Sequence, residues 1–155
     1  MLEKVLITGA SGALAQRVKV QLESNGFKVA ALTTNQKKVD GNSVFYWDVS
    51  KGYIDDTAVE NCSHIIHLSG FSIVKKWTKS NMQIMYDSRI TASKLLYDTC
   101  KRVKSYPKTF ITASAIGFYG FDAVGEQKEE DKPAKDWLAK MCVDWENAAS
   151  KFKDF

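Results

Sequence analysis

The stretch Val5-Leu-Ile-Thr-Gly-Ala-Ser-Gly-Ala-Leu-Ala15 decides the fold of this chain of 155 residues. Its apolar start, Val5–Ile7, is typical of a buried strand, and a glycine-containing turn follows at once. The turn opens a helix predicted over residues 13–24, which Asn25-Gly26 should end. The sequence therefore begins with a strand, a tight turn and a helix in direct succession.

The glycines of this turn predict a site for phosphate groups. Gly9 permits a sharp turn, Gly12 lets the backbone approach a pyrophosphate, and the small Ala15 lets the helix pack closely on the strand. The helix N-terminus adds free N–H groups and the positive end of its dipole. An ordinary strand-to-helix turn is the alternative interpretation. The residues expected at the phosphates are Gly9, Ser11, Gly12, Ala13 and Leu14.

Length and composition indicate one globular domain. The hydrophobic fraction is 45% and the charged fraction 26%, and a chain of this size can bury a sizeable core. The net charge is only +4 and the lysines are scattered, which argues against nucleic-acid binding. The sequence shows no long apolar run, which argues against membrane spanning and secretion. Three widely separated cysteines, Cys62, Cys100 and Cys142, suggest reduced thiols in the cytoplasm.

Alternating strand and helix patterns extend along the rest of the chain. A long helical pattern over about residues 81–103 separates the last two predicted strands. Strands separated by helices form a parallel sheet, and right-handed crossovers give the order 3-2-1-4-5. We therefore expect an α/β fold with a Rossmann-type sheet flanked by helices, as one dinucleotide-binding domain over residues 1–155. The later predicted strands are 28–32, 44–47, 64–68 and 109–113.

Further candidate cofactor residues follow the strands, where a parallel sheet binds its ligand. Asp48 ends the third strand, next to Val49, and a short acceptor there can take an adenine amino group. The alternative is a turn-capping aspartate. Leu68, Ser69 and Gly70 end the fourth strand, where small residues let a nicotinamide ribose lie against the backbone, or form a tight turn.

The second strand ends without a carboxylate, in Thr33 and Thr34. An acidic residue there would hold the 2′-hydroxyl of NAD, so its absence removes a usual contact. Lys37 and Lys38 follow closely enough to meet the 2′-phosphate of NADP. This pattern favours NADP over NAD, although paired lysines on a loop are commonly only solvated.

With these residues in view, the chain resembles the extended short-chain dehydrogenase/reductases, and within them the poorly characterised group called NAD-dependent epimerase/dehydratase. The resemblance implies a Rossmann fold, a nicotinamide cofactor and chemistry at a substrate hydroxyl. Two positions depart from it: Ala15 replaces a third glycine, and Thr34 stands about where that group carries an arginine. The segments that carry the resemblance are Leu6–Gly12, Ile66–Gly70, Lys76-Trp77, Asp87–Ile90, Ser114–Gly120 and Trp137–Glu146.

The resemblance also defines the catalytic question. Enzymes of this superfamily combine a hydroxyl at the end of the fifth strand with a Tyr-x-x-x-Lys pair on the next helix, where the lysine lowers the tyrosine pKa. Ser114 supplies the hydroxyl, but Leu138 and Cys142 occupy the positions of the pair. The literal match, Tyr97-x-x-x-Lys101, lies on the preceding helix and is interpreted as chance.

Other side chains are candidates for a role at the site. Tyr119 lies in a glycine-flanked loop and either assists Ser114 or packs in the core. Arg89 is assigned to the cofactor site, where it can pair with a phosphate or carboxylate, the alternative being a surface ion pair. Cys142 is a nucleophile or a core residue. His64 and His67 should point to different faces of a strand, which argues against a metal pair.

The last helix carries apolar residues up to the end of the chain. The resemblance implies that a sixth strand and a substrate-binding C-terminal region follow such a helix, and neither is present. We therefore expect uncovered surface and self-association on that side. Two functions remain open: an NAD(P)-dependent oxidoreductase or epimerase for a small polar or nucleotide-sugar substrate, and a non-catalytic NAD(P)-binding or redox-sensing module. The apolar residues are Trp145, Ala148, Ala149, Phe152 and Phe155.

Overall fold

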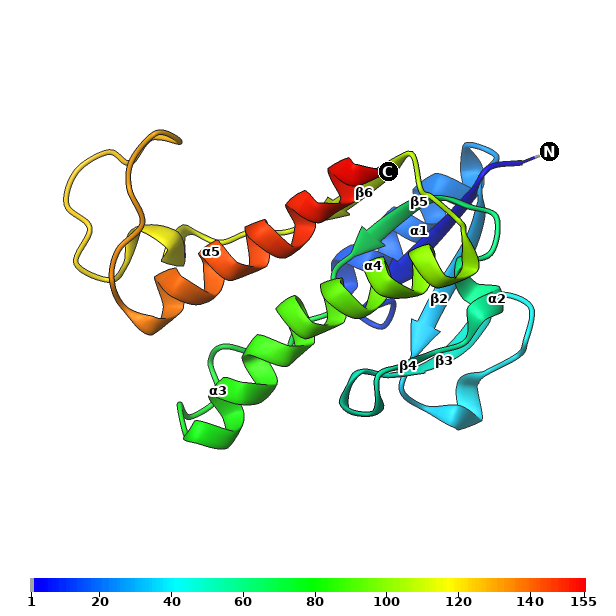
Figure 1. Ribbon diagram of the computed structural model, residues 1–155, viewed down its shortest axis with the longest axis horizontal. Coiled ribbons are helices and arrows are strands. Elements are labelled where there is room, and N and C mark those ends of the chain that lie inside the picture. Colours follow the sequence, from blue (N-terminus) through cyan, green and yellow to red (C-terminus); the bar gives the residue numbers. More distant parts are fainter. Residues whose placement is uncertain (1) are drawn as a thin grey trace.

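The computed structural model describes residues 2–155 and contains one six-stranded sheet flanked by helices (Figure 1). The strand order is β4-β3-β2-β1-β5-β6, and every neighbouring pair is parallel except β3 with β4. Without β4 this is the predicted Rossmann order, so the α/β fold class is confirmed. The strands are β1 (Lys4–Thr8), β2 (Lys28–Thr33), β3 (Val44–Asp48), β4 (Tyr53–Ile54), β5 (Cys62–His67) and β6 (Thr109–Thr112).

The first helix, α1 (Ala13–Ser24), has the predicted bounds and is capped by Asn25. The long predicted helix begins earlier than expected, as α3 (Lys79–Tyr86), and continues through a π-helical turn (Asp87–Thr91) into α4 (Ala92–Val103). The last helix, α5 (Trp137–Ser150), is followed by a 3₁₀ turn. This π turn lies next to the end of β5. Turns of this kind are rare in helices and are frequent at functional sites.

Two short elements escaped the sequence analysis, β4 and the helix α2 (Asp56–Val59). Gly52 adopts the left-handed conformation, with φ +61°, and reverses the chain after β3. Two residues of β4 then pair antiparallel with the end of β3. Elements this short carry no hydrophobic period, so their sequence gives no signal.

Alternate residues of the central strands face two separate cores, because side chains alternate across a strand. One core lies under α1 and the other under α4 and the end of the chain, and Figure 1 shows α4 and α5 lying side by side. Two stacked ring pairs close the second core, Phe110 on Phe152 at 3.8 Å and Tyr97 on Phe155 at 4.7 Å between centroids. The core under α1 consists of Val5, Ile7, Ala15 and Val29.

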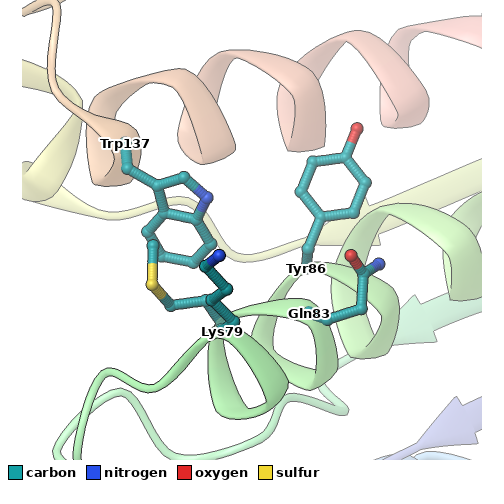
Figure 2. Close-up of a pocket in the computed structure, with 5 residues that line it drawn as sticks. Lys79, Gln83, Tyr86 and Trp137 are labelled. Carbon is teal, nitrogen blue, oxygen red and sulfur yellow. The ribbon is translucent and has the colours of Figure 1, made fainter.

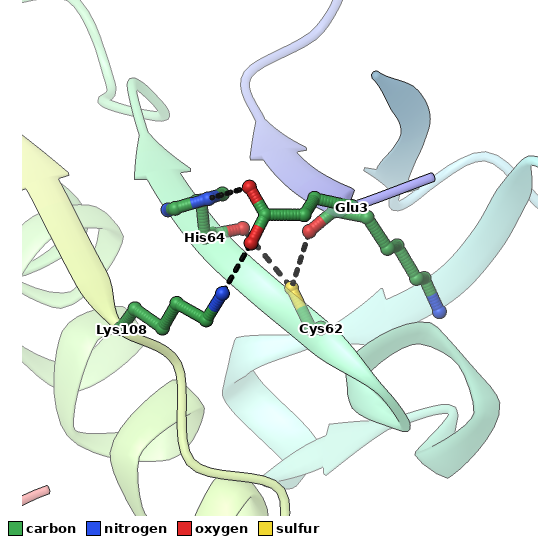
Figure 3. Close-up of polar contacts among 5 residues, drawn as sticks. Glu3, Cys62, His64 and Lys108 are labelled. Carbon is green, nitrogen blue, oxygen red and sulfur yellow. Dashed lines mark hydrogen bonds and ion pairs between the residues drawn. The ribbon is translucent and has the colours of Figure 1, made fainter. Parts of the chain in front are cut away.

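Polar contacts join neighbouring strands at their amino-terminal ends, where β1 and β5 begin (Figure 3). The Glu3 carboxylate pairs with His64 at 3.2 Å and with Lys108, which precedes β6. These contacts lower the pKa of Glu3, Lys108 contributing most. The Cys62 thiol is buried beside this group and donates to the His64 carbonyl at 3.0 Å. These contacts connect β1, β5 and β6 at their amino-terminal ends. The glycine turn lies at the opposite, carboxyl ends of the strands.

Candidate functional site

The turn between β1 and α1 has a backbone shape that only glycine adopts easily at its first position. Gly9 has φ +69°, and the Gly12 N–H donates to its carbonyl at 2.9 Å. A Cβ atom at Gly9 would lie 2.7 Å from the backbone carbonyl carbon of Leu68 and 2.8 Å from the Ser69 nitrogen. The close approach of this turn to the end of β5 therefore requires glycine.

Gly12 differs, because nothing in the chain itself requires it to be a glycine. Its φ is −74°, and a Cβ atom there would meet only the Gly9 carbonyl oxygen, at 3.3 Å. Gly12 caps α1 without a side-chain hydrogen bond, so the helix N-terminus keeps free N–H groups. Ser11, Ala13 and Leu14 beside it are exposed, Leu14 by 63%. This open helix end fits a pyrophosphate, which needs N–H donors and close backbone approach.

A cleft of about 680 Å³ lies across the carboxyl ends of β2, β3 and β5. It brings together five residues expected to bind cofactor: Thr34, Asp48, Val49, Ser69 and Gly70. The other residues that line it come from β3 and the turn after it, from the loop after β5, from α3 and from the π turn. The sequence does not identify these as lining residues, because neither a helical nor a loop position indicates which cleft its side chain faces. They include Phe71, Ile84, Asp87, Ser88 and Thr91.

Asp48 occupies the cleft as a turn cap. Its carboxylate accepts the Ser50 N–H at 3.0 Å and the Ser50 hydroxyl at 2.6 Å, and pairs with Lys51 at 3.4 Å. The hydrogen bond from the Ser50 side chain contributes most to lowering the pKa of Asp48. These contacts correspond to the capping alternative, and the adenine contact stays a prediction.

The segment after β2 forms a short exposed 3₁₀ turn, Gln36–Lys38. The Asn35 side chain caps it by accepting the Lys37 N–H at 3.0 Å, and the Thr33 hydroxyl accepts the Asn35 N–H at 3.1 Å. Both lysine side chains lie outside the cleft's lining, in solvent. Their contact with a 2′-phosphate stays a prediction.

Buried polar contacts hold the ends of β1 and β5 in register at the turn. His67 is fully buried, its Nδ1 lies 2.7 Å from the Thr8 hydroxyl, and its Nε2 lies 3.3 Å from the Arg89 carbonyl. Burial lowers the pKa of His67 to about 4. The Ser69 N–H donates to the Thr8 hydroxyl at 3.2 Å. His67 and His64 contact different faces of β5, as predicted, since His64 packs against Phe27.

Arg89 holds the loop that follows β5. Its guanidinium donates to the carbonyls of Phe71, at 3.1 Å, and Met85, at 3.0 Å, and lies 5.2 Å from the Trp145 ring. Ser88 also holds this loop, because its hydroxyl accepts the Phe71 N–H at 2.8 Å. Burial lowers the pKa of Arg89. Arg89 therefore bonds backbone carbonyls and an aromatic face instead of making the surface ion pair considered from sequence.

A second pocket, of about 530 Å³, brings Ser114 and Tyr119 together after β6. The Ser114 hydroxyl donates to Glu146 Oε1 at 2.5 Å, across 32 residues of sequence. The Tyr119 hydroxyl donates to the Lys128 carbonyl at 2.9 Å, and Glu129 lines the pocket from the same loop. In the sequence, Glu146 stands out only as the last residue of the segment Trp137–Glu146, and nothing there indicates its contact with Ser114.

Leu138, Cys142 and Glu146 follow one another at four-residue spacing along α5, which places them on one side of the helix. Leu138 and Cys142 are buried, and a Cβ atom at Gly117 would lie 2.5 Å from the Leu138 side chain. Burial raises the pKa of the Cys142 thiol, so Cys142 is a core residue and a poor nucleophile. Glu146 is the exposed, ionisable member of this row.

A smaller cavity of about 290 Å³ lies between α3 and the start of α5 (Figure 2). Lys79, Gln83 and Tyr86 line it from α3, and Trp137 closes it from α5. The Tyr86 hydroxyl donates to Asp144 at 3.2 Å. The Trp137 ring also packs on Trp77, with 5.5 Å between ring centroids. Trp77 and Trp137 therefore pack against each other.

Residues 2–155 contain no group of three or more His, Cys, Asp or Glu side chains placed to hold a metal ion. In the same range, every helix is too short or too polar to cross a bilayer. All three cysteines are free and buried. Burial raises the pKa of the Cys100 thiol to about 12.

The parallel sheet, the glycine turn and the cleft at the carboxyl ends of its strands define a Rossmann-type fold of the short-chain dehydrogenase/reductase kind. The chain belongs to the NAD-dependent epimerase/dehydratase family, whose model matches residues 5–151. It is 30% identical to an epimerase family protein of Mycobacterium leprae over 93% of this chain and 46% of that protein.

Solved structures show the same fold. A nucleoside-diphosphate sugar epimerase from Corynebacterium glutamicum has a TM-score of 0.79 and 28% identity, over 99% of this chain and 32% of that one. A human epimerase family protein solved with NADPH has a TM-score of 0.74 and 20% identity, over 94% of this chain and 48% of that one. The chain spans about half the length of the curated relatives it matches.

Proposed function

We propose that this chain binds a nicotinamide dinucleotide and forms the cofactor-binding part of an NAD(P)-dependent oxidoreductase or epimerase. The observation that carries the proposal is the open, uncapped N-terminus of α1 at Gly12, beside a cleft lined by Asp48, Ser69 and Gly70. Family membership and the relative solved with NADPH support it. The substrate proposed for the whole protein is a small polar molecule or a nucleotide sugar.

Different residues of the turn and the cleft would bind different parts of the cofactor. The free N–H groups at the start of α1, those of Ala13 and Leu14, would hold the pyrophosphate, since helix N-termini bind anions. The cleft beside Asp48 and Val49 would take adenine, and the backbone of Leu68–Gly70 would support the nicotinamide ribose. Arg89 would act indirectly, by holding the loop that contains Gly70. When bound, the nicotinamide ring supplies hydride acceptance and return.

The experiment that tests this proposal replaces Gly12 by valine. A side chain there occupies the space in front of the helix N-terminus, so NADP and NAD binding should fall below detection in calorimetry. The fold should survive because the Gly12 backbone lies in the ordinary extended region, with φ −74°. Val20→Ala, an exposed position on the outer face of α1, serves as the control and should bind as the unmodified chain does. Unchanged affinity in a folded Gly12→Val protein would refute the proposal.

NADP is proposed as the preferred cofactor. The end of β2 carries Thr33 and Thr34 instead of an acid, and exposed Lys37 and Lys38 follow. A charge-assisted contact with the 2′-phosphate contributes on the order of 1–3 kcal/mol. The double variant K37A/K38A should therefore lose about tenfold or more of the NADP-to-NAD affinity ratio. The control K75A/K76A, on the loop after β5, should keep it, and an unchanged ratio in the first variant would show that the wrong lysines were chosen.

A second function has its own support. Leu138 and Cys142 are buried. The family resemblance implies that these positions correspond to the acid–base pair of related enzymes, which favours a non-catalytic NAD(P)-binding or redox-sensing module. We expect the chain of 155 residues to bind cofactor and to show no hydride transfer in an NAD(P)H absorbance assay with alcohols, ketones and sugars. Orientation of a substrate supplies several kcal/mol of barrier lowering, and the chain spans about half of its relatives. Turnover by a longer form that Ser114→Ala abolishes would favour the enzyme.

Self-association is proposed on the side of β6. β6 forms an edge of the described sheet, and Ile111 on it is 51% exposed. Unpaired edge strands pair readily with another chain. Sedimentation should show a dimer that Ile111→Lys dissociates, and a monomer at all concentrations would overturn the proposal.

A cytoplasmic location is proposed from the three free thiols.

A further inference from the structure

The hydrogen-bond directions inside the Ser114 pocket are unusually one-sided. The Ser114 proton is donated to Glu146, and the Tyr119 proton is donated to the Lys128 carbonyl. Both hydroxyl oxygens therefore keep only lone pairs for a ligand. Glu129 and Glu146 are carboxylates, which accept hydrogen bonds and donate none when ionised. The polar side chains of this pocket thus offer a ligand acceptors and require donors from it.

Charge points the same way. Glu129 and Glu146 line the pocket, and the remaining described residues that line it are uncharged. Glu146 lies on α5 and Glu129 on the loop after Tyr119, so the two carboxylates reach the pocket from different elements. Moving an anion close to two carboxylates is unfavourable, because like charges repel one another at distances shorter than the Debye length. The charge of the Ser114 pocket therefore disfavours an acidic ligand group and favours a neutral hydroxyl group.

The rest of the wall is apolar. Phe118 and Tyr119 form an edge-on ring pair with 5.1 Å between centroids, and Ile116 is 89% exposed at the rim. Apolar surface next to acceptors suits a molecule with C–H faces and hydroxyl edges, which is the character of a sugar ring. The pocket volume of about 530 Å³ exceeds that of one such ring.

We propose that Glu129 and Glu146 make this pocket selective for an uncharged, hydroxyl-rich group such as a neutral sugar ring, and that they exclude acidic sugars. A ligand hydroxyl donates to the free lone pairs of Ser114 Oγ, and neighbouring hydroxyls donate to the two carboxylates. This inference rests on the proposed function, whose substrate class it narrows. Glu129 and Glu146 are then specificity-determining residues.

The test compares D-glucose with D-glucuronate, which differ only in the oxidation of the last carbon. Each is titrated into the ¹⁵N-labelled chain of 155 residues at pH 7, and the amide signals of residues 114–119 are followed. Glucose should bind at least about tenfold more tightly than glucuronate. The E129Q/E146Q double variant removes both charges, so this ratio should fall to within about threefold.

A matched control and three outcomes decide the question. Glu126→Gln removes a charge on the same loop outside the pocket lining and should keep the ratio. Circular dichroism establishes that each variant is folded. Equal or tighter binding of glucuronate, an unchanged ratio in the double variant, or no response to either sugar would each overturn the proposal. Cofactor binding is read separately from the signals of residues 9–15, so failure here is distinct from failure of the proposed function.

Discussion

The glycine turn and the Ser114 pocket lie at the same edge of the sheet but are built in different ways. The turn is held by buried contacts among Thr8, His67 and Ser69 and by the close approach of Gly9 to the end of β5. The Ser114 pocket is lined by exposed and half-buried residues of a loop, a 3₁₀ turn and α5. The first is part of the core and the second is a surface. Substitutions should therefore change stability at the turn and ligand selectivity at the pocket.

Gly9→Ala should have the largest effect on stability. A Cβ atom there combines a left-handed φ of +69° with overlap of the Leu68 carbonyl at 2.7 Å. The expected loss in the free energy of unfolding is about 3–5 kcal/mol, measured by urea denaturation. Gly12→Ala is the matched control in the same turn and should cost less than about 1 kcal/mol. Equal losses at the two glycines would mean that the turn is less constrained than the contacts indicate.

Acid should loosen the turn through His67. The pKa of this buried histidine is about 4 in the folded chain, lowered from 6.5. Because the unfolded chain then binds more protons between these values, the His67 contribution is complete above pH 6.5 and is lost as the pH falls toward 4. The loss amounts to about 3 kcal/mol.

Urea denaturation at a series of pH values measures this loss. Exposed carboxylates also titrate in acid, so the unmodified chain is compared with His67→Gln, which retains hydrogen-bonding groups but cannot gain charge. The variant should be less stable at pH 7 and should show a shallower decline between pH 6.5 and 4. Parallel declines in the two proteins would assign the acid sensitivity to other groups.

Arg89→Met should cost about 2 kcal/mol, since hydrogen bonds from a charged group to the Phe71 and Met85 carbonyls are lost in a half-buried setting. Hydrogen exchange should quicken most at Phe71 and its neighbours. Arg102→Met is the matched control, because the Arg102 pair with Asp56 is exposed and contributes less than about 1 kcal/mol. Similar losses in both variants would argue against Arg89 as the residue that holds the loop after β5.

Ser114→Ala should have the smallest effect on stability, less than about 0.5 kcal/mol, because the side chain is exposed. Glucose binding to the pocket should nevertheless weaken, since the acceptor that Ser114 offers is removed. Thermal denaturation and the sugar titration measure the two effects on one sample. A large loss of stability would place the Ser114–Glu146 contact with the core and not with the surface.

Local sequence was sufficient for the framework. The apolar run of β1, the glycine at position 9 and the stop signal at Asn25 act through neighbours a few residues away. The structure forms α1 over the predicted residues 13–24, and β1 extends one residue beyond each end of the predicted run Val5–Ile7. The sheet order followed from the alternation of strands and helices, because right-handed crossovers leave few topologies. The cleft residues at strand ends came together for the same reason.

Contacts between distant segments were decided by tertiary packing. The chain alone showed Ser114 and Glu146 32 residues apart, and only the packing of α5 beside β6 places one against the other. The grip of Ser88 and Arg89 on Phe71 likewise depends on the π turn, which has no sequence period of its own. Periodicity and turn chemistry are local properties and determine elements and their order. The direction of a side chain into a shared pocket depends on how two elements rotate against each other, which is set by the whole core at once.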